Sequence, residues 1–163
     1  MAVYELDGVV DTNKRLRLRA VCGGKVSNGN CNYLILDSNT KAENITAEYF
    51  SRFETATNTS YIGCTFNQNT TTQNYAYTKM RFKDCTFKGN FTCYGNYFSF
   101  LLCDFQADLT VEGDYGKISE NTVARIFTLN SGSEYNIITG NHIDTLTDNS
   151  GNTTNEYNNN ITI

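Results

Sequence analysis

The chain has 163 residues and a net charge of −4, and only 18% of its residues are charged. This balance argues against a nucleic-acid-binding protein, which usually carries a basic face, and no apolar run approaches the roughly 18 residues of a membrane span. The chain contains 22 Asn, 22 Thr, 11 Tyr and 10 Phe, and it has no Pro. Since Thr and aromatic residues favour strands and Asn favours turns, the composition predicts short strands joined by tight turns.

The first ten residues, Met1 to Val10, lack the basic region and the apolar stretch of a secretory signal. We therefore expect a protein that first stays in the cytoplasm, or one displayed without a cleaved signal, as in virion assembly. The segment 14–20 alternates strictly and predicts a half-buried strand with Arg15, Arg17 and Arg19 on one face. This basic face is a candidate attachment surface for an acidic partner, and the alternative is the solvated face of an edge or capping strand.

Residues 1–59 fit the repeat of the later segment poorly, and we predict that they form an N-terminal capping or attachment region with irregular first coils. A solenoid needs its terminal coil covered, and this region is the candidate cover. Cys22 and Cys31 bracket a Gly- and Asn-rich loop, and two unrelated thiols are favoured over a disulfide or a metal site because no C-x-x-C pair is present. Residues 47–53 form either a short cap helix or another strand.

A repeat of about twenty residues runs through residues 60–163 and predicts a regular array of coils. Its units read apolar, two variable positions, Cys or Asn, one variable position, and a large apolar residue. The central positions are Cys64, Cys85, Cys103, Asn121, Asn141 and Asn159, which are 21, 18, 18, 20 and 18 residues apart. The apolar positions two residues later are Phe66, Phe87, Phe105, Val123, Ile143 and Ile161.

Apolar and central positions two residues apart share one face of a strand, and the many Thr and Asn would weaken helices of this period. We therefore predict a parallel β-helix of about 6–7 coils, in which like residues stack about 4.8 Å apart. Stacked Phe fill the interior, Asn form a hydrogen-bonded ladder, and the small Cys replaces Asn within it. A second strand per coil is expected at 91–93, 109–111, 126–129 and 146–147, and the polar run 67–74 is expected to bulge from one corner as a loop.

The segment Ile138-Thr-Gly-Asn-His-Ile143 has the pattern apolar-x-Gly-Asn-x-Ile. This pattern resembles the repeat of the pectate-lyase-like superfamily, and the resemblance extends over residues 60–163. It implies a right-handed parallel β-helix, nearest in character to the phage tailspike and fibre solenoids. Because the superfamily also includes lyases, hydrolases, epimerases and autotransporter passengers, the fold alone does not select a function.

Polysaccharide cleavage on such a fold needs carboxylates clustered on one face, as acid and base or as calcium ligands. Arg81, Asp84, Asp104 and Glu120 are the candidates, but the two aspartates fall on offset columns and no Asp-Asp pair occurs. The Arg-x-x-Pro-x-x-Arg pattern of pectate lyases cannot occur in a chain without Pro. We favour a solvated charge cluster, and a surface position for His142. No catalytic residue, metal site or cofactor is predicted.

Columns of Thr and Asn, flanked by tyrosines such as Tyr75, Tyr77, Tyr94 and Tyr97, suit contact with carbohydrate or packing between subunits. The leading hypothesis is a non-enzymatic structural or adhesive β-solenoid: a virion fibre, spike or capsid-attached protein, located on a virion or cell surface. The phage solenoids that the chain resembles imply a homotrimer. The other expected partners are virion or surface proteins and a glycan, with no nucleic acid and no membrane.

Two alternatives come from other classes of protein. The first is a small carbohydrate-active enzyme, a polysaccharide lyase or hydrolase of the same superfamily. The second is an ice- or surface-binding solenoid, which a column of Thr favours and the interruptions of that column by Asp104 and His142 weaken. The chain stops in the strand 160–163, and we expect another subunit, a second domain or a trimer partner to cover this end; the alternative is a fragment of a longer protein or a tolerated exposed end.

Overall fold

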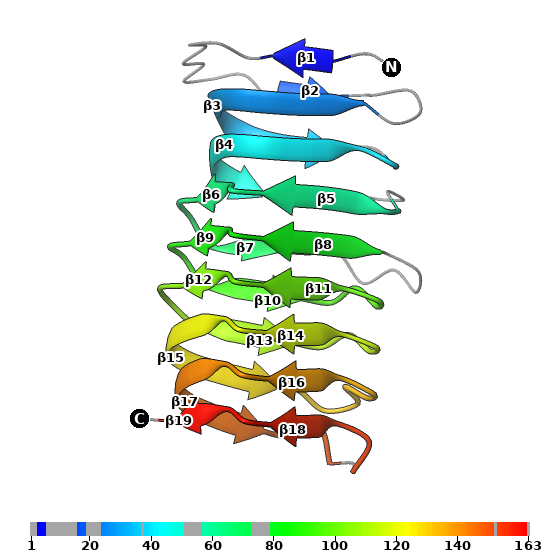
Figure 1. The fold of residues 1–163 in the computed structure, drawn as a ribbon, viewed down its shortest axis with the longest axis vertical. Helices are drawn as coiled ribbons and strands as arrows, with labels where there is room; N and C mark the ends of the chain where they lie inside the picture. The colour runs from blue at the N-terminus through cyan, green and yellow to red at the C-terminus, as the bar shows by residue number, and fades with distance from the viewer. Residues whose placement is uncertain are drawn as a thin grey trace.

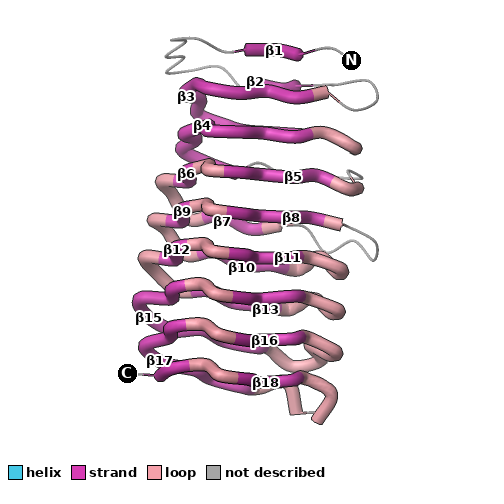
Figure 2. The backbone as a smooth tube through the Cα atoms, viewed as in Figure 1, coloured by secondary structure: helices cyan, strands magenta, loops and turns pink. Residues whose placement is uncertain are grey.

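The computed structural model describes residues 3–5, 16–18, 24–36, 38–50, 57–72, 79–151 and 153–162. These residues form an all-β structure without a helix, a parallel β-solenoid of about six turns that Figure 1 shows as stacked coils. Figure 2 shows the same stack as alternating strand and loop segments. The predicted class, a solenoid of stacked parallel coils, is confirmed. Outside the described residues lie Arg15, Arg19, Cys22, Tyr75 and Tyr77.

The strands fall into three rows, and neighbouring strands of a row pair in parallel. The first row contains β5 (Thr59–Ile62), β8 (Met80–Lys83), β11 (Ser99–Leu101), β14 (Lys117–Ser119), β16 (Ile137–Thr139) and β18 (Glu156–Asn158). The second row contains β6 (Thr65–Phe66), β9 (Thr86–Phe87), β12 (Asp104–Phe105), the beginnings of β15 (Thr122–Leu129) and β17 (His142–Asp148), and β19 (Ile161–Thr162). The third row contains β7 (Thr70–Thr71), β10 (Phe91–Cys93), β13 (Leu109–Val111) and the ends of β15 and β17.

Four further strands precede these rows: β1 (Val3–Glu5), β2 (Leu16–Leu18), β3 (Lys25–Leu36) and β4 (Lys41–Phe50). Strand β3 pairs in parallel with β1, β2 and β4, and β4 pairs with both β5 and β6. The pairing therefore continues across the predicted boundary between residues 59 and 60, while the capping or attachment role of residues 1–59 stays a prediction. Residues 47–50 belong to β4 and are strand rather than helix. Arg17 lies in β2 opposite Ile35.

A bend with left-handed backbone geometry joins the first row to the second in each coil. The bend residues are Gly63, Asp84, Leu102, Glu120, Gly140 and Asn159, with φ of 60°, 53°, 55°, 56°, 65° and 53°. Gly adopts this conformation freely and Asn readily, whereas it costs a side chain such as Leu102 about 1 kcal/mol. The bend turns the chain so that residues on both sides of it, such as Phe82 and Cys85, are buried inside. This explains why the repeat has three-residue spacing before the Cys or Asn and two-residue spacing after it.

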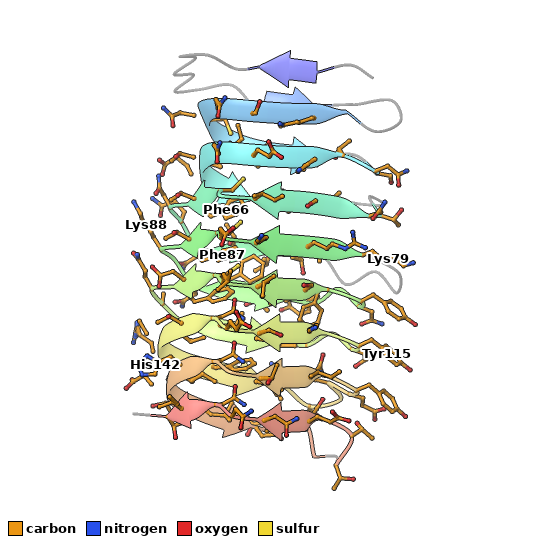
Figure 3. All side chains as sticks on the ribbon, in the orientation of Figure 1. Phe66, Lys79, Phe87, Lys88, Tyr115 and His142 are labelled. Carbon is orange, nitrogen blue, oxygen red and sulfur yellow. The ribbon has the colours of Figure 1, made fainter. Side chains whose placement is uncertain are left out.

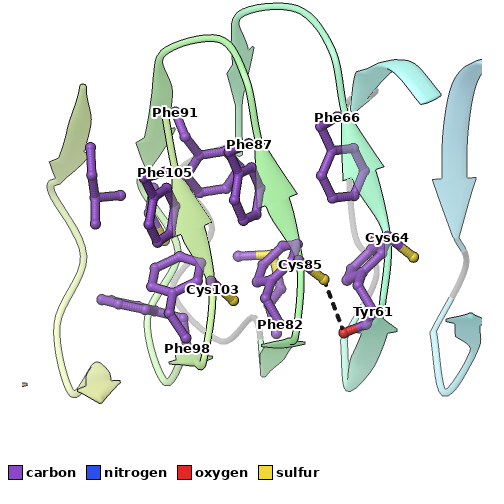
Figure 4. Close-up of a cluster of buried hydrophobic side chains, with 14 of the residues drawn as sticks. Tyr61, Cys64, Phe66, Phe82, Cys85, Phe87, Phe91, Phe98, Cys103 and Phe105 are labelled. Atoms are coloured by element: carbon purple, nitrogen blue, oxygen red, sulfur yellow. Dashed lines mark hydrogen bonds between the residues drawn. The ribbon is translucent and has the colours of Figure 1, made fainter. Parts of the chain in front are cut away.

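Aromatic side chains fill the interior of the coils between residues 59 and 105 (Figure 4). In one column the rings of Tyr61 and Phe82 have centroids 4.7 Å apart, and Phe82 and Phe100 are 5.2 Å apart. The second column, Phe66, Phe87 and Phe105, has centroid separations of 5.1 and 4.7 Å. Aromatic pairs in such geometries add about 0.5–1.5 kcal/mol each beyond the burial of their area.

The same two columns continue through the later coils with smaller aliphatic side chains. Ile118 and Ile138 follow Phe100 in the first column, and Val123 and Ile143 extend the second. All four aliphatic residues are essentially inaccessible to solvent. Along these two columns the lining therefore changes from aromatic to aliphatic, while Phe127 keeps a buried ring in the third row of the later coils.

An asparagine ladder accompanies the aliphatic part of the core. Oδ1 of Asn121 accepts a hydrogen bond from the backbone N–H of Cys103 at 2.8 Å, and Oδ1 of Asn141 accepts one from the backbone N–H of Asn121 at 2.9 Å. The side-chain amides donate in turn to carbonyls of the preceding coil, Asn121 to Phe100 at 3.1 Å and Asn141 to Ile118 at 2.9 Å. Each buried amide thus has partners for its oxygen and its nitrogen, as burial demands.

The next rung of the ladder is Asn160, so the predicted register of the last coil is wrong by one residue. Oδ1 of Asn160 accepts a hydrogen bond from the backbone N–H of Asn141 at 3.0 Å, whereas Asn159 occupies the bend with φ of 53°. Ile161 pairs with His142 and faces outward, 63% exposed, instead of entering the core column. Residues 158–160 are all Asn, so residue type does not select the ladder residue. Asn159 adopts the left-handed bend, and the residue after the bend, Asn160, therefore enters the ladder.

The polar run 67–74 does not bulge out as a whole. Residues 67–72 continue the coil, and Thr70 is buried and pairs with Phe91 in the third row. Met80 aligns again with Phe98 through the pairing of the strands that follow them. The extra residues of this long coil therefore fall between Thr72 and Met80, later than expected.

Five cysteines of the described part, Cys31, Cys64, Cys85, Cys93 and Cys103, are buried free thiols. Cys31 lies inside β3, so the Gly and Asn residues around it belong to a strand rather than to the expected loop. Burial raises the pKa of Cys31 to about 11 and that of Cys93 to about 12. These two thiols therefore stay protonated at neutral pH and pack as small apolar groups.

Candidate binding surface

The charged residues considered for catalysis are spread over different columns. Asp84 and Glu120 occupy the bend column two coils apart, with Leu102 between them. Asp104 belongs to the second row, and Arg81 faces outward in the first row. No two of these carboxylates occupy equivalent positions of adjacent coils.

His142 is exposed in the outward column of the second row, at the same edge of the solenoid as Lys88 (Figure 3). This column contains Thr65, Thr86, Asp104, Thr122 and His142. Among the described residues, no group of three or more His, Cys, Asp or Glu side chains is arranged to hold a metal ion. The described part of the chain also has no helix with the length and hydropathy needed to cross a membrane.

A longer column of threonines lies in the third row. It contains Thr71, Thr92, Thr110, Thr128 and Thr147, one from each of five successive coils, and we call it the threonine column. Its members pair directly across neighbouring strands, so their side chains stand about 4.8 Å apart. Each is at least partly exposed. This column is uninterrupted, unlike the one expected from the sequence.

Three exposed tyrosines lie on top of one another at the corner where the third row leads into the first. The ring centroids of Tyr97 and Tyr115 are 4.9 Å apart with 8° between the planes, and those of Tyr115 and Tyr135 are 5.0 Å apart with 7° between the planes. Their exposed fractions are 41%, 47% and 48%. We call these residues the tyrosine stack. Figure 3 shows Tyr115 at the edge of the solenoid opposite to His142.

Each residue of the tyrosine stack has a left-handed backbone, with φ of 57°, 56° and 56°. In earlier coils the same corner is formed by Asn39 and Asn58, with φ of 61° and 60°, and Nδ2 of Asn58 donates to Oδ1 of Asn39 at 2.9 Å. Asn is enriched in this conformation, whereas it costs a bulky side chain about 1 kcal/mol. The corner itself therefore accepts Asn and does not require Tyr.

Polar groups hold the corner beside the tyrosine stack. The backbone N–H of Asp114 donates to Oδ1 of Asn96, and the backbone N–H of Glu134 donates to Oδ1 of Asp114, both at 2.8 Å. The backbone N–H groups of Tyr97 and Tyr115 donate to the carbonyls of Asp114 and Glu134 at 2.9 and 3.0 Å. Desolvation first, and then the neighbouring rings and carboxylates, raise the pKa of Tyr115, so its phenol stays protonated at neutral pH.

Sequence reasoning singled out Tyr97 and missed Tyr115 and Tyr135, although a signal was present. The three tyrosines are 18 and 20 residues apart, the same intervals that separate the corresponding ladder positions. The threonine column was equally visible, because Thr is the central residue of the expected strands 91–93 and 109–111. Both columns would have been found by aligning every position of the repeat instead of only its apolar ones.

The fold and these columns define the chain as a parallel β-solenoid protein with an ordered polar and aromatic surface. No family model matches the chain, and no curated protein matches it. Among solved structures, the chain is similar to QnrB1, a plasmid-mediated fluoroquinolone resistance protein, with 11% sequence identity and a TM-score of 0.36 over 99% of this chain and 94% of that chain. A likeness at this level carries no argument about what the chain does.

Proposed function

We propose that this chain is a non-enzymatic structural or adhesive β-solenoid that presents its outward columns to a partner, as a fibre, spike or capsid-attached protein of a virion or cell surface. The observation that carries the proposal is the tyrosine stack. Single exposed apolar residues are ordinary, but a contiguous line of exposed aromatic side chains marks an interaction surface. Tyr is also among the residues enriched where binding energy concentrates.

The backbone at the tyrosine stack supports the proposal independently. Asn39 and Asn58 form the same corner in the earlier coils without the steric cost that a bulky residue brings. Tyr in three successive coils therefore works against the local backbone preference, and strain of this kind concentrates where a surface has a task. A role in binding explains why Tyr rather than Asn occupies the corner in three successive coils, beyond the stability that the stacked rings contribute.

The rigidity of this surface also suits binding. Each ring is held by the next, and the adjoining corner is fixed by the bonds from Asp114 to Asn96 and from Glu134 to Asp114. A partner that docks on pre-ordered side chains avoids much of the entropy cost of ordering them. The threonine column adds a second ordered face in the third row.

The placement of the three carboxylates considered for catalysis, Asp84, Asp104 and Glu120, favours binding over cleavage at these residues. Retaining glycosidases hold two carboxyl groups about 5–5.5 Å apart and inverting enzymes about 6.5–9.5 Å apart, on either side of the bond that breaks. Here Leu102 stands between Asp84 and Glu120, and Asp104 belongs to another row. A glycoside hydrolase built on these three residues would need a pair that their positions do not supply.

The virion and trimer parts of the proposal rest on the resemblance of residues 60–163 to tailspike and fibre solenoids. Mass measurement of the purified chain by light scattering tests the trimer. A mass near three times 18.3 kDa supports a fibre-like assembly, and a monomer at micromolar concentration contradicts it.

Adhesion is tested by comparing the wild type with the triple variant Tyr97→Asn, Tyr115→Asn and Tyr135→Asn in depletion assays on bacterial cells and on insoluble polysaccharides. Asn suits the left-handed backbone, so the variant keeps its fold. The matched control is Leu102→Asn, which replaces a residue of similar exposure (48%) and similar φ (55°) at a different corner. We expect the wild type and the control to be retained on the same surface and the triple variant to be released. Retention of none of them, or release of new reducing ends from a polysaccharide, contradicts the proposal.

A further inference from the structure

We infer that the tyrosine stack, with the carboxylates of Asp114 and Glu134 beside it, is a binding site for an extended neutral polysaccharide whose chain runs parallel to the solenoid axis. This inference rests on the proposed function, because it names the ligand class that the adhesive surface takes.

The periodicity of the site points to a polymer. The rings repeat at 4.9 and 5.0 Å along the axis, and the strand pairing fixes that interval. Successive sugars of an extended β-1,4-linked chain repeat at nearly the same interval. Each sugar of such a chain therefore lies level with one ring of the stack, and successive sugars present opposite faces to successive rings.

The orientation of the rings points to a hydroxyl-rich ligand. Tyr115 has both faces covered by Tyr97 and Tyr135, so the stack meets its ligand mainly with ring edges. The edges of an aromatic ring are electropositive and make favourable contact with oxygen atoms. At the end of the stack the next residue of this corner is Thr154, whose side chain is smaller than a ring, and its Oγ1 accepts a hydrogen bond from the backbone N–H of Tyr135 at 3.3 Å.

The charge beside the tyrosine stack favours a neutral polysaccharide over an acidic polysaccharide or a second copy of this chain. Asp114 and Glu134 flank the stack, both are partly exposed, and their carboxylates accept hydrogen bonds from sugar hydroxyls. The same carboxylates repel an acidic polysaccharide, and they repel the stack of a second copy of this chain, which brings the same charges to the contact. The chain as a whole is also acidic, with a net charge of −4.

The test is isothermal titration calorimetry of the full chain with neutral β-1,4-linked gluco-oligosaccharides of two to six sugars. We expect affinity to rise until the oligosaccharide covers all three rings and to level off beyond that length. The triple variant Tyr97→Asn, Tyr115→Asn and Tyr135→Asn should bind at least about tenfold more weakly, a loss of about 1.4 kcal/mol. The control Leu102→Asn should bind like the wild type.

A second set of titrations tests the role of charge. Oligogalacturonides of the same lengths should bind at least about tenfold more weakly than the neutral series, which corresponds to about 1.4 kcal/mol. The double variant Asp114→Asn and Glu134→Gln should narrow that gap, and Asn at position 114 retains the acceptor for the backbone N–H of Glu134. A preference for the acidic series, or affinity that does not change with length, overturns the inference.

The outcomes also separate this inference from the proposed function. If the triple variant loses adhesion to cells while no neutral oligosaccharide binds the wild type, the ligand class is wrong and the adhesive role of the stack stands. If the triple variant keeps both adhesion and oligosaccharide binding, the stack has neither role. Circular dichroism and thermal unfolding of each variant show whether a loss comes from the fold instead.

Discussion

The coils of residues 57–105 and those of residues 117–162 share one backbone register, yet they stabilise their interiors in different ways. The earlier coils combine aromatic columns with a cysteine column whose thiols are weak donors, as in the bond from Cys85 Sγ to the carbonyl of Tyr61 at 3.5 Å. The later coils combine Ile and Val with an asparagine ladder whose bonds are 2.8–3.1 Å long. The earlier half therefore depends on packing, and the later half depends more on buried hydrogen bonds.

The same position of the coil accepts two chemically different side chains, provided that they fit its geometry. Cys103 and Asn121 occupy equivalent positions of adjacent coils, and the backbone N–H of Cys103 already donates to the asparagine side chain. A small residue fits this place either as an apolar group or as an amide with partners in both neighbouring coils. The residue type that this position of one coil accepts therefore depends on the hydrogen-bond partners that the next coil supplies.

The largest expected effect is in the aromatic half. Phe87→Ala should lower the free energy of unfolding by about 4 kcal/mol, because a fully buried ring is lost from the middle of its column. Val123→Ala, in the same column of the later half, should cost about half as much. Urea unfolding followed by circular dichroism measures both. Equal losses at the two positions would contradict a packing-dominated earlier half.

The next effect is in the asparagine ladder. Asn141→Ala removes bonds to the carbonyl of Ile118 and to both backbone and side chain of Asn121, and it should cost about 3 kcal/mol because buried polar groups lose their partners. Asn159→Gly is the control, since Gly suits the bend and should change stability by less than about 0.5 kcal/mol. A loss of about 3 kcal/mol at position 159 would return the last rung to Asn159, as predicted from the sequence, and a small loss at position 141 would contradict the ladder itself.

An exchange between the two halves sharpens the comparison further. Asn121→Cys breaks the ladder at its first rung and should cost about 2 kcal/mol, because the backbone N–H of Cys103 loses its acceptor. Cys103→Asn extends the ladder by one coil and should change stability by less than about 1 kcal/mol. Equal losses from the two exchanges, measured by urea unfolding, would show that the sulfur position cannot take an amide.

Alkaline pH should destabilise the fold through the buried thiols. The ordinary thiol pKa is 9.0, and burial raises that of Cys93 to about 12 and that of Cys31 to about 11. Their contribution is fully present below pH 9 and is lost as the pH rises through the folded values, by up to about 1.4 kcal/mol per pH unit for each thiol. Urea unfolding between pH 8 and 11 measures the decline, and Cys93→Ala should make it shallower. An unchanged slope in that variant contradicts the assignment.

The smallest effect on stability is expected at the surface. Tyr115→Asn should change the free energy of unfolding by less than about 0.5 kcal/mol, because the loss of stacking on Tyr97 and Tyr135 is offset by relief of the left-handed backbone. Thermal unfolding checks this. A loss above 2 kcal/mol would mean that the stack serves the fold, which weakens the case for binding.

Much of the fold was predictable because Phe66, Phe87 and Phe105 repeat at the interval of a coil and strand periodicity places them on one face. Periodicity did not fix the register of the last coil, in which the ladder residue is Asn160 and not Asn159. Residues 158–160 are all Asn, so residue type could not choose among them, and the choice followed from which one adopts the left-handed bend. As a result Thr162, a polar residue, takes the place expected for Ile161 opposite Ile143.

The candidate binding surface was harder to predict for a different reason. Apolar periodicity finds residues that face the core, while Tyr115 and Tyr135 face solvent and stand at corners where a hydrophobicity pattern expects polar residues. Strand pairing of the residues that follow them fixes their alignment with Tyr97. The sequence alone shows three tyrosines spaced at coil intervals, but it does not show that their rings lie in contact on one corner.

The most direct test of the account is whether residues one coil apart lie on top of each other on the outer surface. Nuclear Overhauser spectroscopy on the chain with labelled tyrosine rings measures this at the tyrosine stack. We expect contacts between the rings of Tyr97 and Tyr115 and between those of Tyr115 and Tyr135, and none between Tyr97 and Tyr135. Absence of the two adjacent contacts in the folded protein would contradict the coil register and the binding surface built on it.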